Sequence, residues 1–398
     1  MGVLGEYMSK KMGVDALNNE LRRLITAYNK IRNTYLIIYA GAIWKPIPDL
    51  PLCMDDYYII FDILKDIDTQ KLDFYIETPG GSGTAAEEIV RFLRTKFDHI
   101  TFVVSGEAKS AGTIITLSGN EILMTESGSL GPIDAQVRIG RSTISAYDYM
   151  EWVKEKRVEA EDKRKLNPFD ATMVAQISPG ELEGVNNSLE FAKDLVVDWL
   201  SKYKFKDWNV TETRGIKVTN EKKQERAAEI AEALTNHGKW RSHGRSIKIG
   251  DLEGIGLKIT RVDNEPELAD IIYRIQTVLR LLFMSASTYK IIATYNVKIT
   301  KDAIPTNALR KVPKPAPDSE ANINPSVVEF EVKCQKCGEV HRLYAKLDDN
   351  PNVDDEMQGK GIKPFPSKNK LICNCGFEMD LSGIKNDIEI KIGKEIIN

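Results

Sequence analysis

The sequence has little of what several functional classes require. Its 398 residues include only four histidines and five cysteines, and 55 basic against 58 acidic side chains leave a net charge of −3. A dedicated nucleic-acid binder needs a basic surface, so this balance argues against nucleic acid as a partner. No apolar run approaches the roughly 18–20 residues that a transmembrane helix needs, so we expect no membrane span.

The first 30 residues also lack the pattern of a signal peptide, which combines a charged start, an apolar stretch and a small-residue cleavage site. That region is polar, and residues 10–34 predict an amphipathic helix with one apolar stripe, formed by Leu17, Leu21, Leu24, Ile25 and Tyr28. We therefore expect a cytoplasmic protein. Hydrophobic residues make up 42% of the chain, enough for a large folded core.

Residues 35–135 alternate between apolar strand-like runs and helical patterns. Strands are expected at 36–43, 72–76, 100–105 and 122–124, and helices at 57–67, 85–97 and 114–117. This alternation is typical of βαβ units and a parallel sheet covered by helices on both faces. The sequence therefore predicts an α/β fold. Beyond it, residues 145–236 read as mostly charged helices, 243–257 as a loop, helix and strand, and 268–283 as another amphipathic helix.

Four prolines fall within residues 311–325, a composition that resists both helix and sheet and predicts a linker. The predicted domains are an N-terminal helix at 1–34, an α/β domain at 35–300, the linker at 311–325 and a small module at 326–398.

A Gly-Gly turn follows the second predicted strand, in the sequence TPGG at 78–81. Glycines at this point let the backbone approach a ligand and present free N–H groups. A tight βα turn without further function is the simpler interpretation. Neither a dinucleotide-binding Gly-x-Gly-x-x-Gly pattern nor a phosphate-binding loop fits these residues.

Ser110 comes between the third strand and an apolar helix, in the sequence SAGT at 110–113. Its simplest role is an N-cap. Small neighbours and the positive end of the helix dipole also suit an exposed nucleophile. In that case the N–H groups of Ala111 and Gly81 could form an oxyanion hole.

Two further motifs could complete such a site. LGPIDAQ at 130–136 places Asp134 at the end of a strand, and WRSH at 240–243 contains His243. A lone histidine is more often structural, and the turn around Asp134 is unremarkable by itself. A serine nucleophile, however, needs a base.

In this order, the motifs TPGG, SAGT, LGPIDAQ, WRSH and the Gly256-Leu257 pair resemble the Clp-protease/crotonase superfamily. Within it they are most similar to the serine dehydrogenase proteinase family, kin to signal peptide peptidase A. Ala135 replaces a proline of the family pattern. The resemblance covers about residues 35–260 and implies a Clp-protease/crotonase-like spiral core with added helices. It also implies Ser110 as nucleophile, with Gly81 and Ala111 as oxyanion donors.

The base departs from the Clp pattern, in which a histidine lies in the strand matching residues 133–136. Asp134 stands there instead, and His243 occupies the region of the acidic member. We infer an exchanged triad in which His243 is the base and Asp134 orients it. The peptidase A kin use a Ser–Lys dyad, for which Lys163 or Lys165 are alternatives. Lys109 adjoins the serine but is expected to point away from it.

Four of the five cysteines form two close pairs, Cys334 with Cys337 and Cys373 with Cys375, and a glycine follows each pair. Apolar alternation around these knuckles predicts a small β-rich zinc ribbon in which four thiolates hold a structural zinc ion. His341 is a substitute ligand, and four unrelated buried cysteines are the simpler alternative. Residues 326–398 carry 11 basic and 13 acidic side chains, which favours protein docking over nucleic-acid binding.

The leading hypothesis is a cytoplasmic serine peptidase that cleaves protein or peptide substrates through an acyl-enzyme. A crotonase-like acyl-CoA enzyme and a non-catalytic scaffold on the protease fold are the alternatives. The resemblance also implies a homo-oligomer, for which the helices at 10–34 and 268–283 are candidate contacts. Such a stripe is more often simple core.

Overall fold

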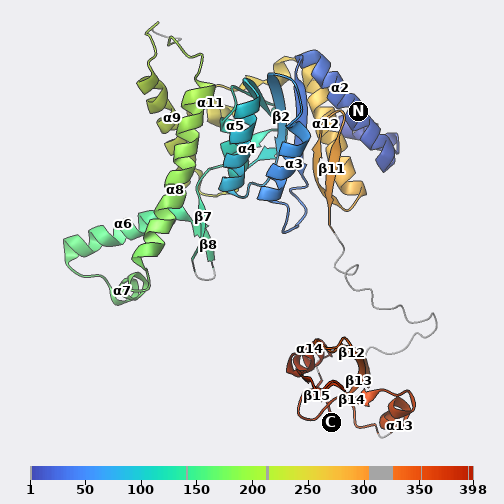
Figure 1. Cartoon of the computed structure of the whole chain (residues 1–398). Helices are drawn as coiled ribbons and strands as arrows, with labels where there is room; N and C mark the ends of the chain where they lie inside the picture. Colours follow the sequence, from blue (N-terminus) through green and yellow to red (C-terminus); the bar gives the residue numbers. More distant parts are fainter. Residues whose placement is uncertain are drawn as a thin grey trace. The chain divides into compact units, whose positions relative to one another are not determined.

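The computed structural model describes residues 2–139, 142–211, 215–303, 326–350, 352–392 and 394–397. The chain divides into two compact units, residues 1–310 and 311–398 (Figure 1). The predicted linker at 311–325 lies outside the described residues. None of the described helices is both long and apolar enough to cross a bilayer.

A seven-stranded sheet forms the centre of the first unit, in the order β11-β10-β1-β2-β3-β5-β9. Five strands are parallel, and β10 and β11 add an antiparallel edge beside β1. The α/β class and the parallel sheet are thus confirmed, whereas the antiparallel edge was not predicted. The strands are β1 (Tyr35–Gly41), β2 (Lys71–Glu77), β3 (His99–Val104), β5 (Glu121–Met124), β9 (Thr260–Arg261), β10 (Thr288–Ala293) and β11 (Lys298–Asp302).

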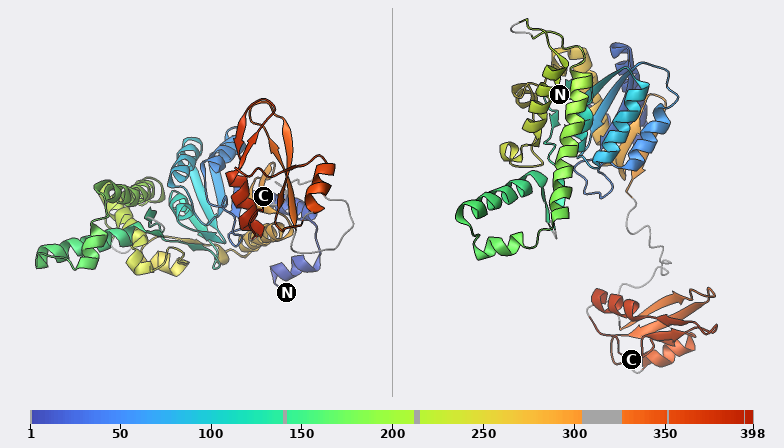
Figure 2. Two further views of the ribbon diagram at one scale, coloured as in Figure 1. Left: turned by 90° about the horizontal axis from the view of Figure 1, so that it is seen from below. Right: turned by 60° about the vertical axis from the view of Figure 1, so that its left-hand side comes forward.

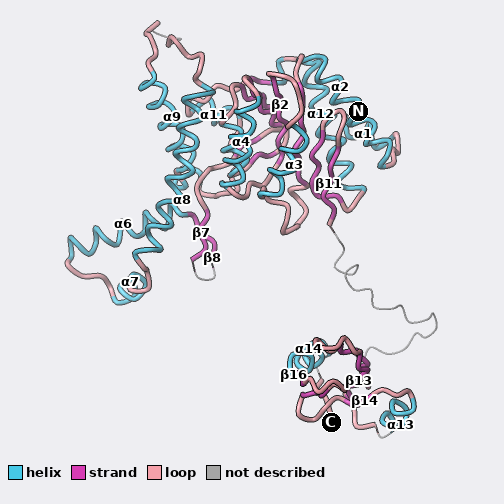
Figure 3. Tube along the Cα trace, viewed as in Figure 1, coloured by secondary structure: helices cyan, strands magenta, loops and turns pink. Residues whose placement is uncertain are grey.

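Helices α3 (Met54–Leu64), α4 (Gly83–Lys96) and α5 (Ala111–Leu117) cover one face of the sheet (Figures 1 and 3). Each follows a strand of the parallel part, and their apolar side chains share one core cluster with the inward-facing residues of β1, β2 and β3. Ala85, Ile89 and Leu93 show the helical spacing that buries α4. The carboxyl ends of β2 and β3 therefore lead directly into short turns and helix N-termini.

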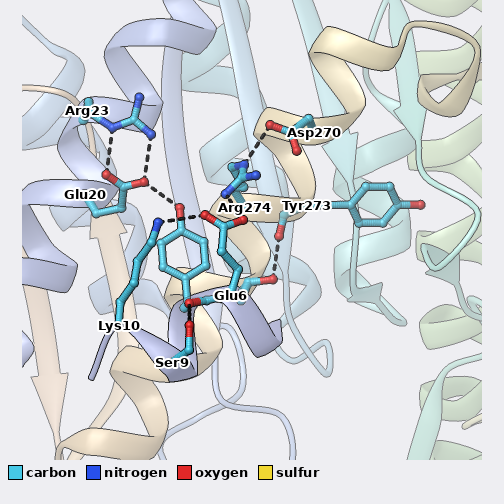
Figure 4. Close-up of polar contacts among 10 residues, drawn as sticks. Glu6, Ser9, Lys10, Glu20, Arg23, Asp270, Tyr273 and Arg274 are labelled. Atoms are coloured by element: carbon cyan, nitrogen blue, oxygen red, sulfur yellow. Dashed lines mark hydrogen bonds and ion pairs between the residues drawn. The ribbon is translucent and has the colours of Figure 1, made fainter. Parts of the chain in front are cut away.

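The opposite face is covered by α2 (Val14–Arg32) and α12 (Pro266–Ser285). The five predicted apolar residues of α2 are buried there, so this stripe and that of α12 form core. The short helix α1 (Val3–Ser9) is tied to α12 by Arg274, which pairs with Glu6 at 3.0 Å (Figure 4). It is tied to α2 by Tyr7, whose hydroxyl donates to Glu20 at 2.5 Å. Both helices named as candidate oligomer contacts thus use their apolar stripes within the chain.

The middle of the chain adds a helical region beside the sheet and an arm that extends away from it (Figure 2). The arm consists of a hairpin and the helices α6 and α7, joined to the body by the long helix α8, which continues into a π-helical turn, η1. The bounds are β7 (Gln136–Ile139), β8 (Ser142–Ser145), α6 (Ala146–Lys163), α7 (Pro168–Val174), α8 (Pro179–Trp199), η1 (Leu200–Lys204), α9 (Asn220–Thr235), α10 (His237–Trp240), α11 (Ile249–Gly254) and the 3-10 turn η2 (Val262–Asn264).

The strand predicted within residues 243–257 is wrong. This segment ends with α11, and the next strand, β9, comes only at Thr260–Arg261. The backbone explains the difference, because Gly256 has a φ of 84° and ends the helix in a turn.

The second unit is small and rich in short strands. Strands β12 (Val327–Lys333), β13 (Val340–Lys346) and β14 (Lys363–Pro364) form one sheet, and β15 (Lys370–Ile372) pairs with β16 (Glu378–Asp380). Helices α13 (Asn352–Gly359) and α14 (Ser382–Ile392) complete the unit. Cys334 and Cys373 are buried in its main core cluster. The predicted β-rich C-terminal module is therefore compatible with a zinc ribbon.

Candidate functional site

Ser110 has an unusual backbone conformation at the junction between the short strand β4 (Glu107–Ala108) and α5. Its φ of 48° and ψ of −116° lie outside the common regions for a non-glycine residue, and its hydroxyl makes no capping bond to α5. The simple N-cap interpretation is therefore not what the structure shows. A strained turn between strand and helix is the backbone arrangement that exposes a nucleophilic side chain in other hydrolases.

The Gly80-Gly81 turn packs directly against Ser110. A Cβ added at Gly80 would lie 2.7 Å from Ser110 Cβ and 3.3 Å from its Oγ. The φ values of Gly80 and Gly81 are 104° and 144°, which glycine alone adopts without strain. The close approach of Ser110 thus requires Gly80, and the Leu52 backbone, 2.4 Å from a Cβ added at Gly81, requires Gly81.

The turn is held by a short backbone pairing with Leu52. Leu52 N–H donates to the Gly80 carbonyl at 2.7 Å, and Ser82 N–H donates to the Leu52 carbonyl at 2.9 Å. Across the described residues, the N–H groups of Gly81 and Ala111 donate to no protein acceptor. These are the two donors that the sequence predicts for an oxyanion hole.

His243 and Asp134 are brought together from positions 109 residues apart. His243 Nδ1 lies 2.9 Å from Asp134 Oδ1, and the Asp134 side chain is fully buried whereas that of His243 is 29% exposed. Gln136 Nε2 donates to the second oxygen, Oδ2, at 3.0 Å. A carboxylate acceptor places the imidazole proton on Nδ1 and leaves Nε2 free to accept another proton.

The segment around His243 is fastened to the base of the Ser110 turn. Ile247 forms a two-way backbone bridge with Leu130, at 3.1 and 2.9 Å. In the same region, Gly131 N–H donates to Thr113 Oγ1 of α5 at 2.9 Å. The described residues contain no hydrogen bond between Ser110 Oγ and His243. Such bonds are often long before substrate binds.

Lys109 is bonded to groups other than Ser110, and the alternative bases Lys163 and Lys165 are exposed. Lys109 points away from Ser110, as expected, and its Nζ donates to the Leu130 carbonyl at 3.2 Å and to Ser246 Oγ at 2.9 Å. Burial lowers the pKa of Lys109. Lys163 lies on α6, 65% exposed and paired with Glu159, and Lys165 is exposed as well. Neither contacts Ser110 in the described part of the chain.

Sequence reasoning did not find a buried ion pair below the Gly-Gly turn. Lys290 Nζ of β10 lies 2.7 Å from Asp56 Oδ2 and 3.2 Å from the Pro51 carbonyl, and both charged side chains are buried. Asp56 also accepts from the N–H of Cys53 at 3.0 Å. The pair thus fixes the segment around Leu52 that clamps the turn. A lysine in an otherwise apolar strand was the available signal.

The four cysteines predicted as metal ligands lie together in the second unit. The sulfur atoms of Cys334, Cys337, Cys373 and Cys375 are all within 4.8 Å of one another, so they could hold a metal ion. Gly338 and Gly376, which follow the two pairs, have φ values of 79° and 81°, as tight knuckle turns require. The simpler alternative of unrelated cysteines does not describe this cluster.

Glu339, His341 and Cys373 form a second group with metal-binding geometry that shares one cysteine with the first. His341 is buried, and its Nε2 has no hydrogen-bond partner among the described residues. The Glu339 carboxylate accepts from the Cys373 thiol at 3.2 Å. His341 therefore remains an alternative ligand beside the four thiols.

Comparison with known protein families finds one whose model matches part of this chain. Residues 52–215 match the family of ClpP-like SDH-type serine proteinases. The predicted resemblance is thereby confirmed for this segment, which includes Gly81, Ser110 and Asp134. The match ends before His243.

Two curated relatives belong to Methanocaldococcus jannaschii. The uncharacterized proteins MJ0137 and MJ1495 are 27% and 26% identical over 49% and 47% of this chain. The chain spans about half the length of these relatives, covering 55% and 51% of them.

Similar solved structures include two variants of the 1510-N membrane-bound stomatin-specific protease, one of them in complex with a substrate peptide. They share 14% and 16% sequence identity with this chain, with TM-scores of 0.32 and 0.26. The similarity covers 56% and 45% of this chain, and 79% and 68% of the solved chains.

Proposed function

We propose that the protein is a serine peptidase that hydrolyses peptide bonds through an acyl-enzyme on Ser110. The observation that supports this most strongly is the strained Ser110 turn, packed against Gly80, with the N–H groups of Gly81 and Ala111 finding no acceptor among the described residues. The family match of residues 52–215 supports the same chemistry.

In the first half of the reaction, Ser110 Oγ attacks the peptide carbonyl carbon while His243 Nε2 takes its proton. The N–H groups of Gly81 and Ala111 stabilise the resulting oxyanion. When the C–N bond breaks, the leaving amine takes the proton from His243 and departs. Asp134 holds the imidazole in the required tautomer through its bond to Nδ1.

In the second half, a water molecule attacks the acyl carbon and gives its proton to His243. The ester bond to Ser110 breaks, Ser110 Oγ regains a proton from His243, and the carboxylic acid product leaves. No redox partner is needed, and each proton that His243 accepts it also returns.

The experiment combines a fluorophosphonate probe, which phosphonylates activated serines, with hydrolysis of a casein-derived peptide mixture. The purified full chain is compared with Ser110→Ala and His243→Ala, and the adduct is mapped by mass spectrometry. An adduct on Ser110 that is lost in both variants, together with peptide cleavage, supports the proposal. An adduct that survives His243→Ala moves the base to a lysine such as Lys163.

Labelling of Ser110 without peptide cleavage would contradict a general peptidase. No adduct at all would favour the crotonase-like acyl-CoA enzyme or the non-catalytic scaffold. An acyl-CoA enzyme would then hydrolyse or isomerise an acyl-CoA substrate equally well in Ser110→Ala, whereas a scaffold would do neither.

We further propose that the cysteine cluster holds one structural zinc ion and that the zinc ribbon recruits substrates or partners. Four thiolates in a closed tetrahedral set are typical of structural zinc, and the cluster geometry supports this assignment. Free cysteines suit a reducing compartment, which supports a cytoplasmic location.

A homo-oligomer is proposed as well, with protein or peptide as the substrate class. Its contacts would have to lie away from the buried stripes of α2 and α12. The arm offers such a surface, because Phe169 is 73% exposed and Val158 is 55% exposed.

A further inference from the structure

A cavity of about 500 Å³ lies on the opposite side of the sheet from α5, under α1 and α12. It is lined by Glu77 at the carboxyl end of β2 and by Gly106 and Glu107, which follow the carboxyl end of β3. This volume is within the usual range for small-molecule sites, and the carboxyl ends of parallel strands are where α/β sheets commonly bind ligands.

This cavity is separate from the Ser110 site. Side chains alternate along a strand, so the neighbours Glu77 and Thr78 point to opposite faces. The methyl group of Thr78 packs against Gly112 of α5, on the Ser110 side, whereas Glu77 faces the cavity. Nothing in the proposed peptidase mechanism uses Glu77.

The Glu77 carboxyl group is held in place but has no cationic partner in the described part of the chain. Tyr75 donates to its Oε2 at 3.2 Å, and this is its one hydrogen bond among the described residues. A Cβ added at Gly106 would lie 2.6 Å from Glu77 Cδ, so the carboxyl group rests directly on the Gly106 backbone. Any side chain at Gly106 would displace it.

Arg280 of α12 provides a positive charge on the same cavity. Its guanidinium lies 5.5 Å from the ring centre of Trp44, and it forms no ion pair within the described ranges. It is near enough to act on Glu77 electrostatically, yet no ion pair joins the two residues. A carboxylate and a guanidinium thus line one cavity without neutralising each other.

The rest of the lining combines the apolar residues Leu4, Ile43, Trp44 and Phe283 with the polar residues Ser127, Gln276 and Thr277. Phe283 is buried and lies against Trp44, with ring centres 6.0 Å apart, and Leu4 of α1 lines the same cavity. The pairing of Arg274 with Glu6 holds α1 over the cavity (Figure 4). An apolar body with a positive and a negative end would match this lining.

We propose that this cavity binds a small zwitterion with an apolar side chain, either a free α-amino acid or a dipeptide. Its ammonium group would lie against Glu77 and Glu107, its carboxylate against Arg280, and its side chain against Trp44 and Phe283. A bound zwitterion would supply each unpartnered charge with its counter-ion.

Isothermal titration of the full chain with L-phenylalanine and with leucyl-leucine tests the proposal, and the preferred probe distinguishes the two sources. Glu77→Gln and Arg280→Gln should each lower the affinity for the tighter-binding probe at least tenfold. The matched controls Glu87→Gln and Arg91→Gln, from a surface ion pair on α4, should leave binding within twofold. Circular dichroism establishes that every variant is folded.

Probes that lack one charge assign each end of the ligand. N-acetyl-L-phenylalanine lacks the ammonium group, so the wild type and Glu77→Gln should bind it with equal affinity. L-phenylalaninamide lacks the carboxylate, so the wild type and Arg280→Gln should bind it with equal affinity.

The proposal is overturned if neither zwitterion binds saturably at millimolar concentrations, or if both cavity variants bind like the controls. A segment of a second copy filling the cavity would give the first result, and Arg280→Gln would then change the oligomeric state in sedimentation. The binding assays need no peptidase activity, so their outcome is independent of the proposed function.

Discussion

Lys109 Nζ donates to Ser246 Oγ across 2.9 Å, and this bond ties the residue before Ser110 to the segment that carries His243. The same ammonium group donates to the carbonyl groups of Leu130 and Arg245, both at 3.2 Å. Lys109 thus joins three separate segments below the candidate site. Its bonds give Lys109 a structural role in holding these segments together and not the role of a proton acceptor for Ser110.

Lys109→Met should therefore lower fluorophosphonate labelling of Ser110 at least tenfold and destabilise the fold. Several buried acceptors lose their donor at once, and each unmade bond costs about 1–3 kcal/mol. Lys109→Arg should restore part of the stability. Urea unfolding and the labelling rate measure the two effects.

Lys163→Met is the matched control, because Lys163 is exposed and pairs only with Glu159 in the described structure. It should leave both labelling and stability unchanged. Loss of labelling in Lys163→Met, with stability intact, would refute His243 as the base and favour a Ser–Lys dyad.

Asp134→Asn should lower kcat for peptide cleavage by about a thousandfold or more while leaving the fold intact. An amide facing His243 Nδ1 favours the wrong tautomer, and the same change in a catalytic triad of another fold costs about 10⁴. Gln136→Ala is the milder comparison, since it removes only the donor to Asp134 Oδ2. Equal kcat in Asp134→Asn and the wild type would exclude an orienting role for Asp134.

Lys290→Met should destabilise the protein by about 3 kcal/mol, because removing one member of a buried pair leaves a buried charge. Asp56 keeps the hydrogen bonds from Lys301 and Tyr39, so we expect the variant to remain folded. Activity should fall as well, since the pair fixes the segment that clamps Gly80 and Gly81. Chemical denaturation and peptide cleavage are the measurements.

The comparison for Lys290 is Lys65→Met, which breaks an exposed pair with Asp62 at the C-terminal end of α3. Exposed pairs contribute only about 0–1 kcal/mol. If both variants lost the same stability, the buried pair would have no special role in holding the turn.

Metal removal should unfold residues 326–398 and leave the first unit folded. Structural zinc supplies much of the folding free energy of a small module. Chelation or Cys337→Ser should abolish one equivalent of bound zinc and the lower-temperature transition in calorimetry. Cys53→Ser, outside the cluster, should retain the metal. A calorimetric trace unaffected by chelation would argue against a structural metal.

The sequence predicts the parallel part of the fold well, because each strand and helix from residue 35 to 124 has its own apolar pattern. The antiparallel edge was missed, since Lys290 interrupts the apolar run of β10 and β11 is largely polar. Only tertiary contact with Asp56 makes that lysine compatible with a buried strand. The motifs singled out Ser110, Gly81 and Asp134, whereas the contact between Asp134 and His243 forms only when the residues between them fold.

Glu77 gives the last prediction, a dependence of stability on pH. Burial raises its pKa from 4.5 to about 7, the bond from Tyr75 opposes this, Glu107 adds to it and Arg280 opposes it. A carboxyl group with a higher pKa in the folded state binds its proton more tightly there. Its contribution to stability is therefore fully present below about pH 4.5 and is lost as the pH rises through 7.

Glu77→Gln removes this ionisation and keeps the shape of the side chain. The variant should match the wild type near pH 4 and exceed its unfolding free energy by about 3 kcal/mol at pH 8, since the pKa of Glu77 rises from 4.5 to about 7 and one pKa unit corresponds to about 1.4 kcal/mol. Urea unfolding at both pH values measures the difference, with Glu87→Gln as the control. A difference of the same size at both pH values would mean that Glu77 acts through packing and not through its charge.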